Sequence, residues 1–532
     1  MTAANRNIAP TTGAKAGRKL AAIDIGSNAV RFALAKWSGG RLTVVEEKRR
    51  PTRLGANLAD AGRLPRGAVK ATIGAVKEFC FDAMRASAQG IRLVATAAVR
   101  EAPDGGAFVA RLEREVGMRV EIIGPDEEAR LAFLSCRAAF DLSRADVAVV
   151  DIGGGSVQIS RSHRGVMFDS ASAPLGAVRM TAAFGGPDKV TAPETWRRLR
   201  RHIDSQLKET LHGGAPRVRT LIGCGGTFAA VRLLLEDVRV DKGPRRQSRV
   251  ALSGHRFAAD ELARLAEEFR RLDTPRRAAW LKRRGIPVDR AEILPAGLLV
   301  AERTARALGA ESFAAHMGGV RDGLLRELGA ASGPMPGMVD EARAFARSAH
   351  YERGHSEHVA RLGVALLHDM AEVDRVREAV RERLDASEII ESAGLLHDLA
   401  VEIDYERHHK IARRIVELAP WRSMDIEQRA IVANLCRYHR KSLPSESHAA
   451  FASLPRRVRI LVGTLAGILR IADGLDRTHT QKVHGVRVRS TRGVIEIMAE
   501  GAVPDDANLR AARKKSDLLA EITRRKVVVR AG

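Results

Sequence analysis

Two short segments of the chain have nearly the same sequence, and they constrain the fold more than any other feature. Residues 21–28 read AAIDIGSN and residues 149–160 read VVDIGGGSVQIS. Each is an apolar run that ends in Asp-Ile-Gly. This pattern predicts a buried strand that turns tightly into a hairpin, because glycine accepts positive φ without steric cost. Two copies of the same strand and turn predict two similar lobes that face each other.

The same turns predict an anion-binding site. Backbone N–H groups converge in a glycine-rich turn and form a concave set of donors that suits phosphate. A nearby carboxylate can hold the water shell of a divalent cation. Each copy alone fits an ordinary turn equally well, but the pair, in the same order and with similar flanking strands, favours two lobes with a phosphate between them.

The length and composition predict a multidomain globular protein. A chain of 532 residues is too long for one core and implies about three or four domains. No apolar run approaches the roughly 20 residues of a membrane span, and residues 1–19 are small, polar and basic, without the apolar segment of a secretory signal. We therefore expect a disordered tail over 1–19, no membrane association and a cytoplasmic location.

The charge balance predicts a polyanionic partner. The chain has 89 Lys and Arg against 64 Asp and Glu, a formal net charge of +25. Nucleic acid, acidic lipid and polyphosphate all fit such a bias, and arginine-rich segments such as 196–202, 243–249 and 281–285 suit phosphate oxygens. An aromatic content of 4% argues against nucleic acid, because surfaces that stack bases need aromatic side chains. A solvated basic surface remains the alternative.

Hydrophobic periodicity divides the chain into an α/β part and a helical part. Residues 20–145 predict strands within 21–37, 41–50, 91–99 and 119–124, and helices within 69–88, near 106–117 and from Pro125. Residues 146–330 predict a second α/β lobe, with strands within 146–162 and 219–227 and helices within 194–211, 229–236 and near 320–328. A linker at 329–340 precedes a helical domain over 341–480 and a small α+β module over 481–532.

The order of the motifs resembles one protein family. Through residues 20–330 the chain is similar to the exopolyphosphatase and guanosine pentaphosphate phosphohydrolase family, and the helical region resembles the longer members of that family. The motifs are AAIDIGSNAVRF, RLGANL, VATAAVREA, EIIGPDEEARLAF, VVDIGGGS, APLGAVRMTAAF, IGCGGT, DRAEILPAG and GGVRDGLL, followed by HSEHVARL, GLLHDLA, HHKIARRIV and RYHRKSLP. The resemblance implies two actin-like ATPase (ribonuclease H-like) lobes, a phosphate chain in their cleft, a divalent cation, usually Mg²⁺, and a homodimer.

The resemblance also assigns residues to the site. The two turns become phosphate loops, with Asp24 and Asp151 as ligands of the cation. Arg100 would grip phosphate oxygens as a two-pronged donor. The phosphate-binding residues implied in this way are Ser27, Asn28, Arg100, Gly153, Gly154, Gly155, Ser156, Gly225, Gly226 and Thr227.

Hydrolysis needs a base that orients the attacking water. The family's general base aligns with Glu128, the acid before Ala-Arg in PDEEARLAF, whereas Asp126 and Glu127 only offset the helix dipole. One position departs from the family. Where the family has Ser-Thr-Glu after its glycines, this chain has Ser156, Val157 and Gln158, which puts Mg²⁺ affinity or turnover in doubt.

The helical domain contains a second group of candidate ligands. His355, His397, Asp398 and Asp473, together with His408, His409 and His439, resemble an HD-type site for a second divalent cation. The alternative is a purely structural role, because this domain in long exopolyphosphatases looks structural and channel-forming. Basic residues near its end suggest a channel wall that guides a long anion toward Glu128, formed by Arg437, His439, Arg440 and Lys441.

The sequence thus predicts an exopolyphosphatase that removes terminal phosphates processively from inorganic polyphosphate. The first alternative is a phosphohydrolase that acts on the 5′-γ-phosphate of guanosine pentaphosphate. The second, suggested by Gln158, is a weakly catalytic protein that binds polyphosphate or signals through it.

Overall fold

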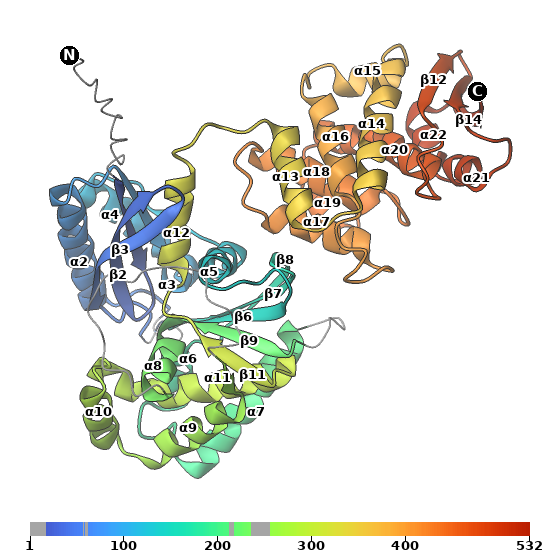
Figure 1. Ribbon diagram of the computed structural model, residues 1–532. Helices are drawn as coiled ribbons and strands as arrows, with labels where there is room; N and C mark the ends of the chain where they lie inside the picture. Colours follow the sequence, from blue (N-terminus) through green and yellow to red (C-terminus); the bar gives the residue numbers. More distant parts are fainter. Residues whose placement is uncertain (1–16, 57, 59–61, 212–217, 236–255) are drawn as a thin grey trace, which may run out of the picture. The chain divides into compact units, whose positions relative to one another are not determined.

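The computed structural model describes residues 17–56, 58, 62–211, 218–235 and 256–532 (Figure 1). Most of the expected tail and the basic segment 243–249 lie outside these residues. The prediction of a tail up to residue 19 is wrong at its end, because the first strand begins at Arg18.

The first sheet has the strand order β3-β2-β1-β4-β5. Strand β1 pairs antiparallel with β2 and parallel with β4, so the predicted hairpin after Asp-Ile-Gly is confirmed. The strands are β1 (Arg18–Ile25), β2 (Ala29–Ser38), β3 (Arg41–Pro51), β4 (Gly90–Ala95) and β5 (Glu121–Ile122). The helices of this region are α2 (Arg66–Arg85), α3 (Ala97–Glu101), α4 (Gly105–Val116) and α5 (Pro125–Ala139).

One predicted strand of this lobe is too long. The expected strand within 91–99 ends at Ala95, and Ala97–Glu101 forms the short helix α3. Thr96 separates the two elements and its hydroxyl donates to the carbonyl of Ile25 at 3.3 Å. The next residues are alanines, which favour helix. Arg100 therefore lies on a helix rather than at a strand end.

The second sheet repeats the order of the first. Its order is β10-β11-β9-β6-β7-β8, so β8-β7-β6-β9-β11 corresponds to β3-β2-β1-β4-β5. The strands are β6 (Asp146–Ile152), β7 (Val157–His163), β8 (Val166–Ala173), β9 (Thr220–Cys224), β10 (Phe257–Ala258) and β11 (Ser312–Ala315). The repeated turn sequence therefore reflects a repeated lobe.

The helices of this lobe are α6 (Ala177–Ala183), α7 (Pro193–Thr210), α8 (Gly225–Leu235), α9 (Asp260–Arg271), α10 (Thr274–Arg283) and α11 (Leu294–Leu308), with a 3₁₀ turn at Val288–Glu292. The expected strand within 219–227 is too long, because β9 ends at Cys224. Gly225 has φ +78°, which ends the strand and starts α8. Gly225, Gly226 and Thr227 are thus the first turn of a helix.

Helix α12 (Val320–Ala330) follows the second sheet in the chain but packs on the first. Its Leu324 and Leu325 are fully buried in a core shared with Leu20 and Val94. Helix α12 also lies against α5, and a Cβ at Gly323 would come within 2.3 Å of the carbonyl oxygen of Leu131. This close approach fixes the position of α5 in the lobe.

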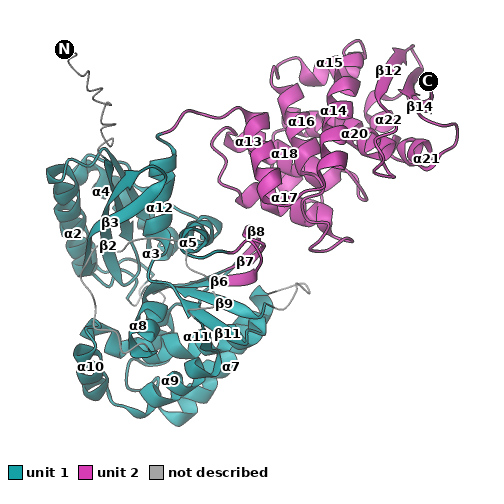
Figure 2. Ribbon diagram, viewed as in Figure 1, with its two compact units in different colours: residues 1–141, 149–159, 171–332 teal, residues 142–148, 160–170, 333–532 magenta. Residues whose placement is uncertain are grey.

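The contacts divide the chain into two compact units (Figure 2). Unit 1 covers residues 1–141, 149–159 and 171–332, and unit 2 covers 142–148, 160–170 and 333–532. Within 341–480 the structure has helices only: α13 (Met338–Ser348), α14 (Arg353–Asp369), α15 (Asp374–Val380), α16 (Ala386–Leu396), α17 (His408–Leu418), α18 (Ile426–Tyr438), α19 (Ala449–Ala452) and α20 (Arg456–Leu475).

The end of the chain forms a small sheet of order β12-β13-β14 with two helices. Its elements are β12 (Gly485–Ser490), β13 (Val494–Glu500), α21 (Ala507–Lys514), α22 (Asp517–Thr523) and β14 (Lys526–Ala531). Both helices pack against α20, so the helical part and this module share one hydrophobic core. Among the described residues, no helix has both the length and the apolar character that crossing a membrane requires.

We predict that Gly323→Ala destabilises unit 1. The added methyl group would overlap the backbone of Leu131, so α5 and α12 would have to move apart. Overpacking of this kind costs about 1–3 kcal/mol, so thermal unfolding should begin a few degrees earlier. The matched control is Gly74→Ala on α2, where a Cβ meets nothing within 4 Å and a small stabilisation is expected. Equal unfolding temperatures for both variants would contradict the account of the α5–α12 contact.

Candidate active site

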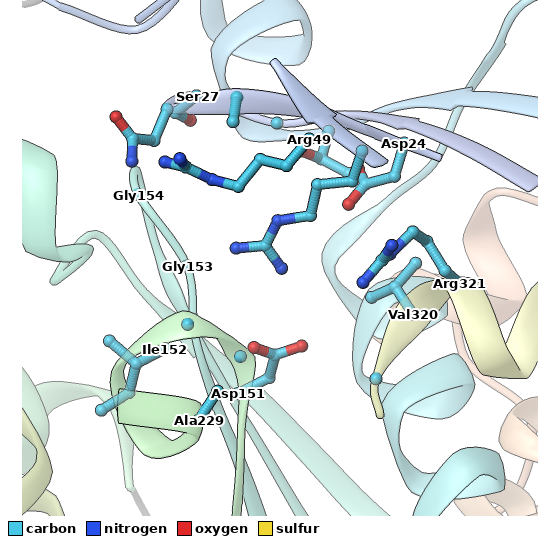
Figure 3. Close-up of a pocket in the computed structure, with 18 of the residues that line it drawn as sticks. Asp24, Ser27, Arg49, Asp151, Ile152, Gly153, Gly154, Ala229, Val320 and Arg321 are labelled. Atoms are coloured by element: carbon cyan, nitrogen blue, oxygen red, sulfur yellow. The ribbon is translucent and has the colours of Figure 1, made fainter. Parts of the chain in front are cut away.

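Both repeated turns line one pocket of unit 1, with a volume of about 350 Å³. Figure 3 shows Asp24, Arg49 and Arg321 on one side of this pocket and Asp151, Ile152 and Gly153 on the other. The site residues predicted in the two loops line it: Asp24, Ser27, Asn28, Asp151, Gly153, Gly154, Gly155 and Ser156. The structure therefore brings the two halves of the sequence repeat together.

The two turns close with the same hydrogen bond. The N–H of Gly26 donates to the carbonyl of Ala29 at 3.2 Å, and the N–H of Gly153 donates to the carbonyl of Ser156 at 3.0 Å. Each turn follows a strand whose penultimate residue is an aspartate, Asp24 in β1 and Asp151 in β6. The repeat thus places two carboxylates and two sets of backbone donors in equivalent positions.

A helix N-terminus adds further donors. Gly225 and Gly226, the first residues of α8, line the pocket, and helix N-termini bind phosphate through free N–H groups and the helix dipole. A Cβ at Gly226 would lie 2.1 Å from a guanidinium nitrogen of Arg290, so a side chain here would displace that guanidinium from its present position. Thr227 does not line the pocket. It is buried and its hydroxyl faces Gly297 of α11, so the structure does not place this side chain in the pocket, and its contact with phosphate stays a prediction.

Asp24 and Asp151 fit a divalent cation. Burial raises the pKa of both carboxyl groups, that of Asp151 to about 6, although the Arg31 guanidinium lowers both. Oδ1 of Asp24 is buried and has no hydrogen-bond partner within the described part of the chain. A buried carboxylate oxygen that lacks a donor is the kind of ligand that Mg²⁺ prefers. The chemistry of the site therefore agrees with the predicted metal ligands.

Sequence reasoning missed the arginines of the pocket. Arg31, Arg49, Arg290 and Arg321 all line it. For Arg31 the sequence contained a signal, because a charged residue interrupts an apolar strand. In the structure, Arg31 lies directly opposite Asp24 in the register of β1 and β2. Arg49 and Arg321 come from β3 and α12, and only the fold shows that these elements end at the same pocket.

The arginines are arranged to receive an anion. Burial lowers the pKa of Arg31, and the neighbouring Arg321 lowers it further. Burial, with repulsion from Arg31 and Arg49, also lowers the pKa of Arg290 to about 9. Phosphate between these groups would offset both the desolvation and the mutual repulsion. Arg49 is held by a two-pronged pair with Asp289, at 2.6 and 3.2 Å.

Glu128 lies in the first turn of α5 and lines the same pocket. It is 7% exposed, and burial raises its pKa to about 7 against the opposing effect of Arg100. Nη1 of Arg100 donates to Glu128 Oε1 at 2.5 Å and to the carbonyl of Ile123 at 2.6 Å. Arg100 thus holds the carboxylate, and its predicted contact with phosphate stays a prediction. A carboxyl group of raised pKa thus lies in the same pocket as Asp24 and Asp151.

Gln158 also lines the pocket and is 3% exposed. Its Nε2 donates to Ser156 Oγ at 2.7 Å. The amide therefore fixes the hydroxyl of the second loop, a contact that a carboxylate could not make as a donor.

The second predicted ligand group also assembles, in unit 2. His355, His397, Asp398 and Asp473 lie together, joined by His408 and His439. Of the predicted channel wall, Arg437 is 8% exposed and does not line the pocket of unit 2 that His439 lines. The guanidinium of Arg437 lies over the Tyr438 ring at 5.6 Å, and His439 belongs to the histidine and aspartate group. Arg440 and Lys441 do line a pocket of unit 2.

Comparison with known proteins identifies the family. The family model of the Ppx/GppA phosphatases matches residues 34–330, and that of Ppx/GppA phosphatase domain III matches residues 341–511. The chain belongs to the Ppx/GppA phosphatase family. The resemblance inferred from the motifs is thereby confirmed, and it extends into unit 2.

The names of two relatives refer to two different substrates. Exopolyphosphatase 1 of Mycobacterium leprae is 28% identical over 312 residues, which cover 58% of this chain and 88% of the relative. A guanosine-5'-triphosphate,3'-diphosphate pyrophosphatase of Aeromonas hydrophila is 25% identical over 463 residues, which cover 87% of this chain and 88% of the relative. The family is one of phosphatases, and both relatives are named for phosphoanhydride substrates.

Solved structures of the family confirm the fold. An exopolyphosphatase-like protein superposes with a TM-score of 0.52 at 26% identity, covering 59% of this chain and 99% of that one. An exopolyphosphatase from Cytophaga hutchinsonii, 18% identical, gives a TM-score of 0.51 and covers 59% of this chain and 98% of its own. The two lobes have the actin-like ATPase fold that the motifs implied, followed by a helical region and a small terminal sheet.

We predict that Arg31→Met weakens the binding of tripolyphosphate, because it removes a buried cation that faces the phosphate position. Hydrogen bonds to charged groups contribute about 1.5–3 kcal/mol, which corresponds to about a 10- to 100-fold loss of affinity by calorimetry. Arg41→Met, at the exposed first residue of β3, is the control and should bind as the unmodified protein does. Affinities within twofold for all three proteins would argue against an arginine-lined phosphate site.

Proposed function

We propose that unit 1 is an exopolyphosphatase that hydrolyses terminal phosphate from inorganic polyphosphate. The observation that carries the proposal is one pocket lined by two phosphate loops, four arginines and a buried glutamate whose pKa is about 7. A chain of phosphates presents many anionic oxygens and no base or sugar, which suits a site of backbone donors and guanidinium groups. The Mycobacterium leprae relative, named exopolyphosphatase, supports this choice.

Each group of the pocket has a place in the proposed reaction. The loops at Gly26–Asn28 and Gly153–Ser156 hold the terminal phosphoryl group, and Arg31 and Arg290 balance the charge of its oxygens. Glu128 accepts the proton of the attacking water as the new P–O bond forms and the anhydride bond breaks. Arg100 keeps the carboxylate in position, because it ties Oε1 to the fixed carbonyl of Ile123.

Asp24 and Asp151 would hold Mg²⁺, because they are the carboxylates of the two loops and Asp24 Oδ1 is without a donor in the described structure. When bound, the ion supplies positive charge that stabilises the phosphate oxygens. The same charge offsets the desolvation that raises the pKa of both aspartates.

The second candidate is hydrolysis of guanosine pentaphosphate at its 5′-γ-phosphate. The alignment with the Aeromonas hydrophila relative, which extends over 87% of this chain, favours it. Phosphate release from long-chain polyphosphate and from guanosine pentaphosphate, measured in one assay, separates the two. A higher kcat/KM for polyphosphate supports the proposal, and the reverse order assigns the chain to the nucleotide. A homodimer, which the resemblance implies, stays a prediction.

The proposed reaction makes a prediction about Glu128. Glu128→Gln should lower kcat about 100- to 10,000-fold, the usual contribution of a positioned base, and leave the affinity for polyphosphate within a few fold. In the unmodified protein, kcat/KM should rise with pH through about 7 as Glu128 loses its proton and fall above about 9 as Arg290 loses its charge. Rates of phosphate release measured at a series of pH values from 5 to about 10 give both the rise and the fall of this profile.

Glu127→Gln is the matched control, because Glu127 lies in the same turn and pairs with Arg130 at 2.7 Å. Its turnover should stay within a few fold. A Glu128→Gln protein that keeps full turnover, or an acid limb that lies near pH 4.5, would rule out Glu128 as the base.

A further prediction concerns Gln158, which stands where the resemblance to the family implies a glutamate. Gln158→Glu adds a carboxylate to the pocket, so the Mg²⁺ concentration for half-maximal phosphate release should fall about 10-fold. Gln158→Ala is the control, because it removes the hydrogen bond to Ser156 without adding charge. An unchanged Mg²⁺ requirement in the glutamate variant would contradict this prediction. It would mean that the two aspartates and the substrate already suffice to hold the ion. Turnover by the unmodified protein at the usual rate for an enzyme, about 1 s⁻¹ or more, would also argue against a weakly catalytic binding protein.

A further inference from the structure

Helix α6 holds the second phosphate loop, Gly153–Ser156, from behind. Backbone N–H groups at the start of this helix donate to the carbonyls of all three glycines of the loop. The donor and acceptor pairs are Ala177 to Gly153 and Val178 to Gly154, both at 3.0 Å, and Gly176 to Gly155 at 3.2 Å. The carbonyls therefore point toward α6. The N–H groups of Gly154 and Gly155, which have no acceptor among the described residues, remain for an anion in the pocket.

The side chain of Arg179 adds a further tie to this loop and crosses to the other lobe. Its Nε donates to the carbonyl of Gly155 at 2.8 Å, and its Nη2 pairs with a carboxylate oxygen of Glu101. Arg179 belongs to α6 of the second lobe, whereas Glu101 is the last residue of α3 in the first lobe. One guanidinium thus joins the second phosphate loop to the first lobe.

Glu101 stands on a helix that is itself fixed. The preceding residue, Arg100, donates to the carbonyl of Ile123 and to Glu128. Helix α3 therefore carries, on adjacent residues, the contact that holds the proposed base and the contact that reaches the second loop.

The two phosphate loops touch each other beside this ion pair. A Cβ at Gly155 would lie 2.8 Å from Ser27 Oγ and 3.2 Å from the Cβ of Ala97, the first residue of α3. A Cβ at Gly154 would lie 3.1 Å from the Cβ of Ser27. Because the contact is this close, any movement of one lobe against the other changes the distance between the loops and the distance between Arg179 and Glu101.

A second cavity lies on the far side of the loops. Its volume is about 210 Å³, and both Glu101 and Arg179 line it. It shares Ser27, Gly154 and Gly155 with the active-site pocket, so the loops form the wall between the two spaces. Arg179 does not line the active-site pocket. Its guanidinium supports this wall from behind and does not reach the phosphate position.

Stability alone gives little reason for this ion pair. The side chains of Arg179 and Glu101 are 28% and 37% exposed, and ion pairs with this exposure contribute little to the free energy of unfolding. A positioning role and a structural role therefore predict different results when the pair is removed.

We propose that Arg179 is a positioning residue of the unit 1 reaction, which holds the second phosphate loop in its binding orientation through Gly155 and is itself held by Glu101 of the first lobe. The inference rests on the proposed function, because it assigns a task within the same phosphate site. Arg179 acts through the loop, whereas Arg31 and Arg290 face the phosphate directly.

The test compares binding with turnover. Arg179→Met loses a hydrogen bond from a charged donor, so its affinity for tripolyphosphate should fall about 10-fold. Calorimetry measures this without Mg²⁺, so that no turnover occurs. KM for polyphosphate should rise by the same factor and kcat should stay within a few fold, because Glu128 and Arg100 are unchanged. The matched control is Arg219→Met, an exposed arginine of the same lobe that pairs with Glu311 at 3.3 Å, and its affinity should stay within twofold.

Glu101→Gln tests the link between the lobes. It keeps the size of the side chain and removes its charge, so the affinity should fall several fold. The double variant should bind no more weakly than Arg179→Met alone, because the two residues act as one unit. Losses that multiply in the double variant would overturn the link to the first lobe.

A merely structural role gives a different result. It would lower kcat through a smaller folded fraction and leave KM unchanged, and that result, or an unchanged affinity in both single variants, overturns the proposal. Circular dichroism and thermal unfolding check the folding, and Glu101→Gln alone carries the test if Arg179→Met does not fold. Absence of phosphate release from polyphosphate by the unmodified protein would refute the proposed function only, since the tripolyphosphate affinities are measured without turnover.

Discussion

The burial of opposite charges in one pocket is the constraint on which unit 1 depends. Arg31 pairs with Asp24 across the first hairpin, and its charge also acts on Asp151 of the second lobe. Removing such charges from water costs several kcal/mol for each ion and is offset only when opposite charges are held close. Both lobes must therefore be in place before the pocket is stable. The charges of the pocket do not fully compensate one another. Burial still raises the pKa of Asp151 and Glu128 and lowers that of Arg31 and Arg290. A cation beside a phosphate chain would supply the missing opposite charges.

The duplicated topology explains how one short sequence produces both halves of this pocket. The two sheets have the same strand order, and the turns after β1 and β6 close with equivalent hydrogen bonds from Gly26 and Gly153. Strands β1 and β6 therefore each present an aspartate, followed by a turn of backbone donors, at equivalent positions of the two sheets. Helix α12 joins the lobes in sequence and structure, since it follows the second sheet but packs its leucines on the first and presents Arg321 to the pocket.

The parts of the fold that were predictable from sequence depend on local pattern, and those that were not depend on long-range packing. The hairpin at residues 21–38 and the two glycine loops follow from neighbouring residues, whereas Glu128 was assigned by the resemblance to the family. The surroundings of Thr227 and Arg437 could not be predicted, because only the packed structure shows that one faces α11 and the other lies on Tyr438. Arg49, Arg290 and Arg321 were missed because they are far apart in sequence and resemble ordinary surface arginines. His408 and His439 were seen in sequence, but their shared orientation follows from carbonyls three residues earlier in the chain.

The central claim about the reaction is that burial raises the pKa of Glu128 to about 7. The protonation state of this side chain can be measured without substrate. Infrared difference spectra of the unmodified protein against Glu128→Gln isolate the carboxyl and carboxylate bands of this side chain as pH is varied. The account predicts that the carboxyl band disappears with a midpoint near pH 7, because burial outweighs the hydrogen bond from Arg100. A midpoint near the ordinary glutamate value of about 4.3 would show that the pocket is well solvated, and would contradict the account of a base tuned by desolvation.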